Sequence, residues 1–170
     1  MMAGNLRAEF QEFWTRTVGK VRAYMFCACQ NWTDADDMTQ DCYLRALRGW
    51  GQFNGSASRE AWLFGIARRT SVDSFRRRQR QAAVVTGAEV KDQGGPAPAE
   101  AGDEKIDKVW NAVGALNADQ NQVIHMRFAA GLSYAQIAQA LGVPVGTVRS
   151  RLHRGLETVR ERIGRTDDEP

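Results

Sequence analysis

The chain lacks the long apolar segments and the cysteine patterns that mark several classes of protein. No apolar run approaches the roughly 20 residues of a membrane-spanning helix, and Arg7 and Glu9 lie where a signal peptide would carry its apolar core. The 3 cysteines, Cys27, Cys29 and Cys42, are odd in number and contain no CxxC pair, which excludes a disulfide framework and a zinc-finger spacing. We therefore expect a cytoplasmic protein without membrane insertion, whose thiols are reduced and partly buried.

Patterns of catalysis and of metal binding are also missing. No nucleophile, base and acid lie at a recognisable catalytic spacing, and no catalytic glycine-rich loop is present. His125 and His153 have no partners at metal-ligand spacing. The sequence therefore predicts no catalytic residue, no metal site and no cofactor, and we do not expect an enzyme.

Charge is distributed unevenly along the chain. The 170 residues are 43% hydrophobic and 25% charged, as in ordinary globular proteins, and the net charge is only +3. Residues 58–80 carry 7 positive and 2 negative side chains, residues 106–165 carry 8 and 4, and residues 81–105 carry 2 and 5. Two basic segments separated by an acidic one fit a protein that contacts a polyanion through two modules. Two solvated helix faces explain the charge alone equally well.

A segment rich in glycine, proline and acidic residues divides the chain. Residues 86–103 have no apolar periodicity, which indicates a flexible linker. The helical period dominates on both sides of it, and strand-like alternation is absent. We therefore predict an all-α fold with two small helical domains joined by a flexible linker. The predicted limits are a domain over residues 1–82, a linker over 83–104, a domain over 105–165 and an acidic tail over 166–170.

Apolar residues recur every three or four positions in the first 50 residues, which predicts amphipathic helices. A second helix is expected to begin with Thr33 as its N-cap, because the Thr33 hydroxyl can accept the backbone N–H of Asp36, and to end near Trp50. Acidic residues near its start fit the positive end of the helix dipole. The stripe of the preceding one or two helices consists of Leu6, Phe10, Phe13, Trp14, Val18, Val21, Met25 and Cys29.

The next predicted helix is rich in arginine. It follows a turn over residues 52–56, and Ser58 can cap it. The helix dipole does not need this many cations, so phosphates are the expected partners. Phe53 and Trp62 lie nearby, and bases can stack on such rings. For Trp62 we prefer core packing, and for Phe53 both interpretations stay open. The arginines are Arg68, Arg69, Arg76, Arg77, Arg78 and Arg80.

The most specific pattern in the chain is a helix-turn-helix in the C-terminal domain. Ser133 and Gln136 form a capping box at the start of a short helix over residues 134–141. Gly142 can take the left-handed conformation that ends a helix, and a tight turn follows. Ala138 is small enough for the two helices to approach closely, and Val148 is expected to close the small core between them.

The second helix of this motif, over residues 146–162, has one apolar and one polar face. Short polar groups near its start can contact base edges in the major groove, and arginines can hold phosphates. A helical hairpin that does not bind DNA is the alternative. The apolar face consists of Val145, Val148, Leu152, Leu156 and Val159. The predicted DNA-binding residues are Thr147, Arg149, Ser150, Arg151, His153 and Arg154.

Together these motifs resemble the extracytoplasmic-function (ECF) sigma factors, which retain only regions 2 and 4 of the sigma-70 superfamily of RNA polymerase sigma factors. Residues 34–47 resemble region 2.2, residues 62–78 resemble regions 2.3 and 2.4, and residues 132–156 are very similar to region 4.2. The order and spacing of these segments carry the resemblance, because a helix-turn-helix alone also suits many repressors and response regulators.

The resemblance implies a role in transcription initiation. In the family, region 2.2 docks on the β′ clamp helices of core RNA polymerase, regions 2.3 and 2.4 melt and recognise the −10 promoter element, and region 4.2 recognises the −35 element. It further implies promoter DNA, the β flap of the polymerase and an anti-sigma factor as partners. The free chain is expected to be monomeric and to need no cofactor. The linker permits both a closed and an extended arrangement of the domains.

Two groups of site residues follow from this resemblance, in addition to those of the helix-turn-helix. Expected polymerase contacts are Asp37, Gln40, Asp41, Leu44 and Leu47. Expected −10 contacts are Phe53, Asn54, Gly55, Ser56, Arg68, Arg69, Asp73, Arg76, Arg77 and Arg80, and residues 53–56 would capture an unstacked base. Two other functions stay open: a stand-alone helix-turn-helix regulator, and a decoy that binds an anti-sigma factor.

Overall fold

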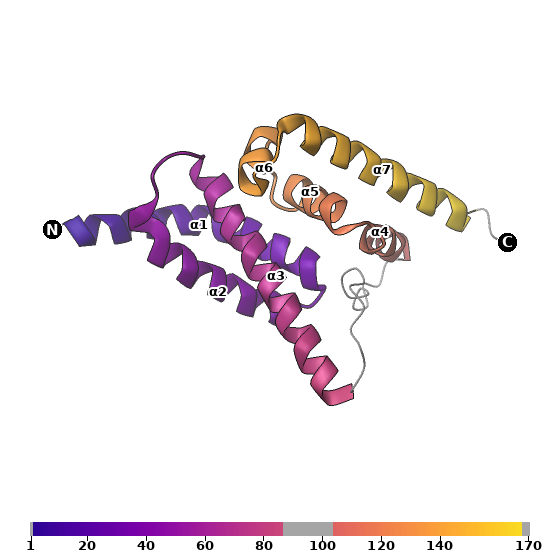
Figure 1. Ribbon diagram of the computed structural model, residues 1–170, viewed down its shortest axis with the longest axis horizontal. Coiled ribbons are helices and arrows are strands. Elements are labelled where there is room, and N and C mark those ends of the chain that lie inside the picture. The colour runs from indigo at the N-terminus through magenta and orange to yellow at the C-terminus, as the bar shows by residue number, and fades with distance from the viewer. Residues whose placement is uncertain (1, 87–103, 168–170) are drawn as a thin grey trace.

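A computed structural model describes residues 2–86 and 104–167 of the chain. Every regular element in these ranges is a helix, so the predicted all-α class is confirmed. Figure 1 shows the helices in two groups, α1 to α3 and α4 to α7. The elements are α1 (Met2–Cys29), α2 (Trp32–Gly49), the 3-10 helix η1 (Trp50–Gln52), α3 (Arg59–Thr86), α4 (Glu104–Gly114), α5 (Ala118–Phe128), α6 (Tyr134–Leu141) and α7 (Val145–Asp167).

Most of the predicted linker and the end of the predicted tail lie outside the described residues. The described residues include the edges of both segments. Helix α3 continues to Thr86 and α7 to Asp167, so both helices extend past the predicted domain ends at residues 82 and 165. None of the helices in the described ranges is long and apolar enough to cross a membrane.

Aromatic rings fill the space between α1 and α2. Phe13 stacks on Trp50 with 5.2 Å between the ring centroids, and Phe10 lies 5.3 Å from both Tyr43 and Trp50. The apolar stripe predicted for α1 is therefore confirmed from Phe10 onward. Leu6 is a correction, since it is 43% exposed. The reason is that Trp50 packs against Phe10 and Phe13, and Leu6 lies one helical turn before Phe10.

The start of α2 corrects the predicted N-cap. The cap is Asn31, whose backbone is extended (φ −142, ψ 125) and whose side-chain oxygen accepts the N–H of Asp34 at 3.0 Å. Thr33 lies inside the first turn, so its prediction as N-cap was wrong by two residues. The physical reason is the reversal at Gln30 (φ 53), which ends α1 and places Asn31 in the conformation that an N-cap requires.

The three cysteines are free thiols inside the α1 to α3 group, as predicted. Cys29 and Cys42 are buried, and Cys27 is half-buried. Burial raises the pKa of Cys27 and of Cys42 to about 12, because the thiolate would lose its hydration. At neutral pH these two thiols are therefore protonated, and they contribute to packing.

Helices α6 and α7 form the predicted helix-turn-helix. The Ser133 N–H donates to Gln136 Oε1 at 2.9 Å, and the Gln136 N–H donates to Ser133 Oγ at 3.2 Å, which completes the capping box. Gly142 ends α6 in the left-handed conformation (φ 68, ψ 35), and its N–H donates to the Ala138 carbonyl. Ala138 is 7% exposed and Val148 is fully buried, so both occupy the predicted positions.

Three of the five residues of the predicted apolar face of α7, Val148, Leu152 and Val159, are buried. Val145 and Leu156 are corrections, because they are 38% and 39% exposed. At this level of the helix it is Gly155 that faces α5. A Cβ at Gly155 would lie 2.9 Å from Ile124 Cδ1 and 3.4 Å from Gln120 Cβ, so the missing side chain permits a close crossing of α5 and α7.

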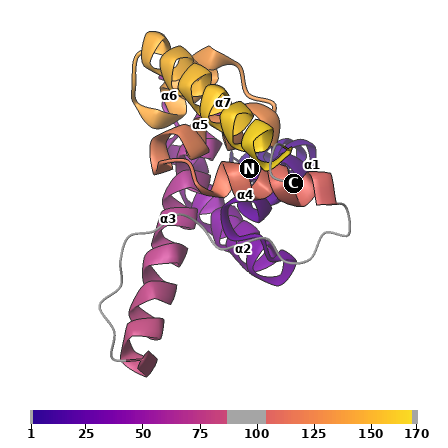
Figure 2. The ribbon, with the colours of Figure 1, turned by 90° about the vertical axis from the view of Figure 1, so that its right-hand side faces the viewer.

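The two helical groups pack together through α3. The Ser58 N–H, just before α3, donates to Gln139 Oε1 of α6 at 3.1 Å, and Arg68 Nε donates to Gln122 Oε1 of α5 at 2.9 Å. A Cβ at Gly65 would lie 3.5 Å from a carbonyl oxygen of α6. Figures 1 and 2 both show the first half of α3 beside α6 and its second half projecting away. This is the closed one of the two arrangements expected from the sequence.

Candidate functional site

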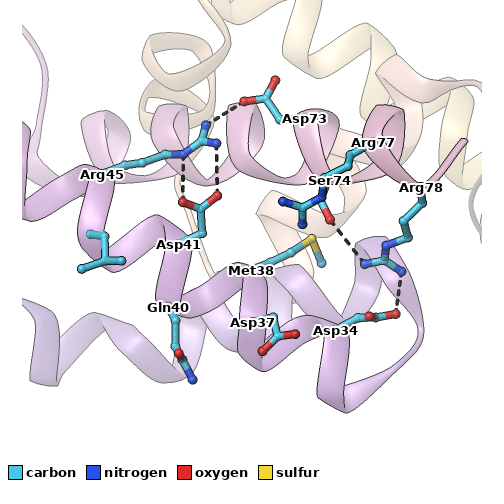
Figure 3. Close-up of a pocket in the computed structure, with 11 residues that line it drawn as sticks. Asp34, Asp37, Met38, Gln40, Asp41, Arg45, Asp73, Ser74, Arg77 and Arg78 are labelled. Atoms are coloured by element: carbon cyan, nitrogen blue, oxygen red, sulfur yellow. Dashed lines mark hydrogen bonds and ion pairs between the residues drawn. The ribbon is translucent and has the colours of Figure 1, made fainter. Parts of the chain in front are cut away.

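A groove between α2 and α3 is lined by charges of both signs. Its volume is about 460 Å³, and Figure 3 shows carboxylates of α2 opposite arginines of α3. A groove with both signs of charge suits a partner that is itself charged with both signs. The lining residues are Asp34, Asp37, Met38, Gln40, Asp41, Leu44, Arg45, Asp73, Ser74, Arg77 and Arg78.

Two arginines bridge the helices across this groove. Arg45 of α2 contacts Asp41 Oδ2 at 3.1 Å and Asp73 Oδ2 of α3 at 2.7 Å. Arg78 of α3 contacts Asp34 Oδ2 of α2 at 2.5 Å. All of these side chains are at least a third exposed, so each pair stabilises the fold by about 1 kcal/mol or less. Their main effect is to fix where these charges point.

The five expected polymerase contacts lie on α2, but they differ in environment. Asp37 and Gln40 are exposed, and Leu44 is 46% exposed, so this surface of α2 offers an apolar group beside polar ones. Asp41 shares its carboxylate with Arg45. Leu47 is half-buried against the aromatic core, so it stabilises the domain as well as bordering this surface.

The arginines of α3 occupy three faces of the helix. Arg69, Arg76 and Arg80 are spaced by seven and four residues, which places them on one side, and all three are exposed. Arg77 lines the groove, and none of the described residues forms an ion pair or hydrogen bond with its side chain. Arg68 faces the C-terminal helices, where it binds Gln122. The expected −10 residue Asp73 is bonded to Arg45.

The expected base-capturing loop lies at the start of α3. Phe53 is half-buried, 5.5 Å from the Trp62 ring and 6.5 Å from the Trp50 ring, and the following residues 54–56 are exposed. Trp62 packs against the core, which confirms the preferred interpretation of that residue. The Ser58 hydroxyl accepts the Ala61 N–H at 3.1 Å, as predicted for the cap of α3. Phe53 thus borders a solvent-accessible loop that is anchored on rigid rings.

The polar face of α7 points away from the rest of the helix-turn-helix. Arg149 and Arg154 are exposed, and their guanidinium groups have no ion pair within the described ranges. Arg151 Nη2 contacts Asp119 Oδ2 of α5 at 2.5 Å, and His153 Nδ1 lies 3.2 Å from Glu157 Oε2. The two other expected contacts, Thr147 and Ser150, lie at the start of this helix, where the Ser150 hydroxyl donates to the Thr147 carbonyl at 3.0 Å.

Several residues that hold these surfaces in place were missed by sequence analysis. Asp119 binds Arg151, Gln122 binds Arg68, and Gln139 accepts the N–H that precedes α3. These partners are far apart in the sequence, so no short-range signal could identify them. The Asp41–Arg45 pair is different, because its i,i+4 spacing on one helix could have been recognised.

Family models match most of the chain. Sigma-70 region 2 matches residues 13–81, and Sigma-70, region 4 matches residues 106–159. The ECF RNA polymerase sigma factor SigX of Bacillus subtilis is 29% identical over 147 residues, which cover 82% of this chain and 76% of SigX. The ECF RNA polymerase sigma factor SigK of Mycobacterium tuberculosis is 30% identical over 165 residues, which cover 94% of this chain and 88% of SigK.

Solved structures show the same architecture. The sigma factor RpoE of Bartonella quintana, crystallised with the anti-sigma factor NepR, has a TM-score of 0.73 and 26% identity, covering 92% of this chain and 97% of RpoE. CnrH, solved with the cytosolic domain of CnrY, has a TM-score of 0.68 and 22% identity, covering 96% and 91%, and this likeness supports the fold. On the two family matches and these relatives, the chain belongs to the sigma-70 family as an ECF sigma factor with regions 2 and 4.

Proposed function

We propose that this sigma factor binds core RNA polymerase through α2 and recognises promoter DNA through α3 and α7. The observation that carries the proposal is the exposure of arginines on two helices of separate groups, Arg69, Arg76 and Arg80 on α3 and Arg149 and Arg154 on α7. Two phosphate-binding surfaces on two modules fit two separate promoter elements. The chemistry of RNA synthesis belongs to the polymerase, and we expect no catalytic residue, metal or cofactor in this chain.

The two family matches support this division into two modules. Region 2 would occupy residues 1–82 and region 4 residues 105–165, with the linker over 83–104. The two family matches fall inside these limits. With both domains bound to polymerase, we expect the linker to let them separate and reach the two elements.

For the polymerase contact, the exposed surface of α2 is the proposed site. Asp37 and Gln40 offer polar acceptors, and Leu44 offers an apolar group that would lose its hydration on binding. The partner proposed for this surface is the pair of β′ clamp helices. The β flap is the proposed partner of the C-terminal domain.

For the −10 element, the proposed site runs from the Phe53 loop along α3. An unstacked base would enter the loop of residues 53–56, and the exposed stripe of Arg69, Arg76 and Arg80 would hold the backbone phosphates. Arg68 can join them only when the domains separate, because in the closed arrangement it is bonded to Gln122. The closed arrangement is therefore proposed to be inactive toward the promoter.

For the −35 element, α7 is the proposed recognition helix. Arg149 and Arg154 are oriented to solvent and would contact DNA directly, together with Ser150 and His153 near the start of the helix. Arg151 is held by Asp119, so we propose that it mainly fixes α7 on α5.

An anti-sigma factor is the proposed regulator. RpoE of Bartonella quintana, which shares this architecture, was crystallised with the anti-sigma factor NepR. A partner that holds the two domains closed would keep Arg68 away from DNA. We further propose that the protein acts in the cytoplasm, where the polymerase acts.

The test uses holoenzyme reconstituted from core polymerase and the full chain. The variant Arg149→Ala with Arg154→Ala should lose footprint protection at the −35 element and bind promoter DNA at least about tenfold more weakly, with a shallower dependence on salt. Arg160→Ala is the control, because Arg160 is also exposed on α7 but lies outside the predicted contacts. An unchanged footprint in the double variant would contradict the proposed −35 site.

The same experiment separates the remaining alternatives. A stand-alone regulator would protect DNA without core polymerase, and it would not copurify with core polymerase. A decoy for an anti-sigma factor would keep working with both arginines replaced, because its activity would not involve DNA.

A further inference from the structure

Arg77 and the neighbouring arginines of α3 differ in what surrounds them. Arg76, Arg77 and Arg80 are all exposed, but of these three only Arg77 lines the groove between α2 and α3. Arg78, the next residue, is bonded to Asp34 across the same groove. Consecutive arginines of one basic run therefore have different surroundings, and the run of identical residues in the sequence gives no sign of this difference.

The groove contains two charges that the fold leaves available. Asp34, Asp41 and Asp73 are each bonded to an arginine of the protein. Asp37 on α2 and Arg77 on α3 make no ion pair or side-chain hydrogen bond with any of the described residues. Figure 3 shows both residues at the groove, and none of its dashed lines reaches Asp37 or Arg77.

From this arrangement we infer that Arg77 binds the polymerase, together with Asp37, and does not hold promoter phosphates. The inference deepens the proposed function and rests on it, because it extends the α2 surface across the groove onto α3. The partner that fits is a helical segment with a basic side chain opposite Asp37 and an acidic side chain opposite Arg77. An aliphatic side chain of the same segment would cover the exposed part of Leu44.

Charge and size favour a protein segment over DNA in this groove. A phosphate that reached Arg77 would approach four carboxylates of the lining, those of Asp34, Asp37, Asp41 and Asp73, at least one of which has no arginine beside it. Arginine stripes that bind nucleic acid offer the backbone an uninterrupted positive surface. The volume of about 460 Å³ lies within the range of pockets that enclose several side-chain-sized groups.

The test measures the affinity of the full chain for core RNA polymerase in the absence of DNA. Arg77→Ala and Asp37→Ala should each weaken binding at least about fivefold, because each removes one charge of the pairing. Arg76→Ala is the matched control, since it removes an adjacent exposed arginine and should change the affinity by less than about twofold. Arg77→Lys, which keeps the charge, should restore most of the binding.

The outcomes separate this inference from the proposed function. If Asp37→Ala weakens polymerase binding and Arg77→Ala leaves it within about twofold, Arg77 is not a polymerase contact and the inference is wrong, while the α2 site stands. A reduced salt dependence of promoter binding by Arg77→Ala holoenzyme would then assign Arg77 to DNA. If neither variant changes polymerase binding, both the inference and the proposed α2 site fail. Far-ultraviolet circular dichroism checks that each variant is folded.

Discussion

Gly155 allows α5 and α7 to cross closely, so replacing it should loosen the helix-turn-helix domain. In Gly155→Ala the new Cβ would lie 2.9 Å from Ile124 Cδ1, 3.4 Å from Gln120 Cβ and 3.6 Å from Ile124 Cγ1. Ile124 is only 6% exposed, so its terminal methyl group could move aside only within the packed interior. Overpacking of this kind costs about 1–3 kcal/mol, whereas alanine gains about 1 kcal/mol over glycine inside a helix.

The matched control is Gly164→Ala, also in α7. A Cβ there would meet nothing within 4 Å, so only the helix-propensity gain of up to about 1 kcal/mol remains. The free energy of unfolding, measured by urea titration, should therefore be lower for Gly155→Ala than for Gly164→Ala by about 1–3 kcal/mol. Equal stabilisation by the two variants would refute the close contact between α5 and α7.

Three further predictions concern the two domains and their contact. Val148→Ala should lower the free energy of unfolding by about 2 kcal/mol, because Val148 is fully buried, whereas Val145→Ala should cost less than about 1 kcal/mol. Burial lowers the pKa of His125 to about 4, so the folded state resists protonation of this side chain. The free energy of unfolding should therefore be highest above about pH 6.5 and fall by up to about 3 kcal/mol as the pH drops toward 4. Urea titrations at several pH values should show this slope, and His125→Gln should flatten it. Gln139→Ala removes the acceptor of the Ser58 N–H, so hydrogen exchange at Ser58 should accelerate if the closed arrangement exists in solution, and an unchanged rate would count against it.

Local signals explain which parts of the fold could be predicted from the sequence. The capping box of Ser133 and Gln136 and the left-handed Gly142 are set by residues within a few positions of one another. Their geometry therefore depends little on the rest of the chain. The N-cap of α2 was misplaced because Asn31 and Thr33 are both good capping residues, and the choice depends on the reversal at Gln30.

The candidate surfaces could be predicted only in part, because side-chain partners come from distant elements. The periodicity of α3 shows that it is basic, but not that Arg68 faces α5 or that Arg77 faces α2. The same holds for Asp73, whose partner Arg45 lies on another helix. Such assignments need the packing of the helices, which composition and spacing do not specify.

Run-off transcription measures whether this chain directs initiation by core RNA polymerase. Core RNA polymerase that lacks any sigma factor would be incubated with genomic fragments, with and without the full-length chain. Discrete transcripts that start at specific promoters are expected only when the chain is present. Copurification with core polymerase without any promoter-specific transcript, or no association with core polymerase at all, would contradict this expectation.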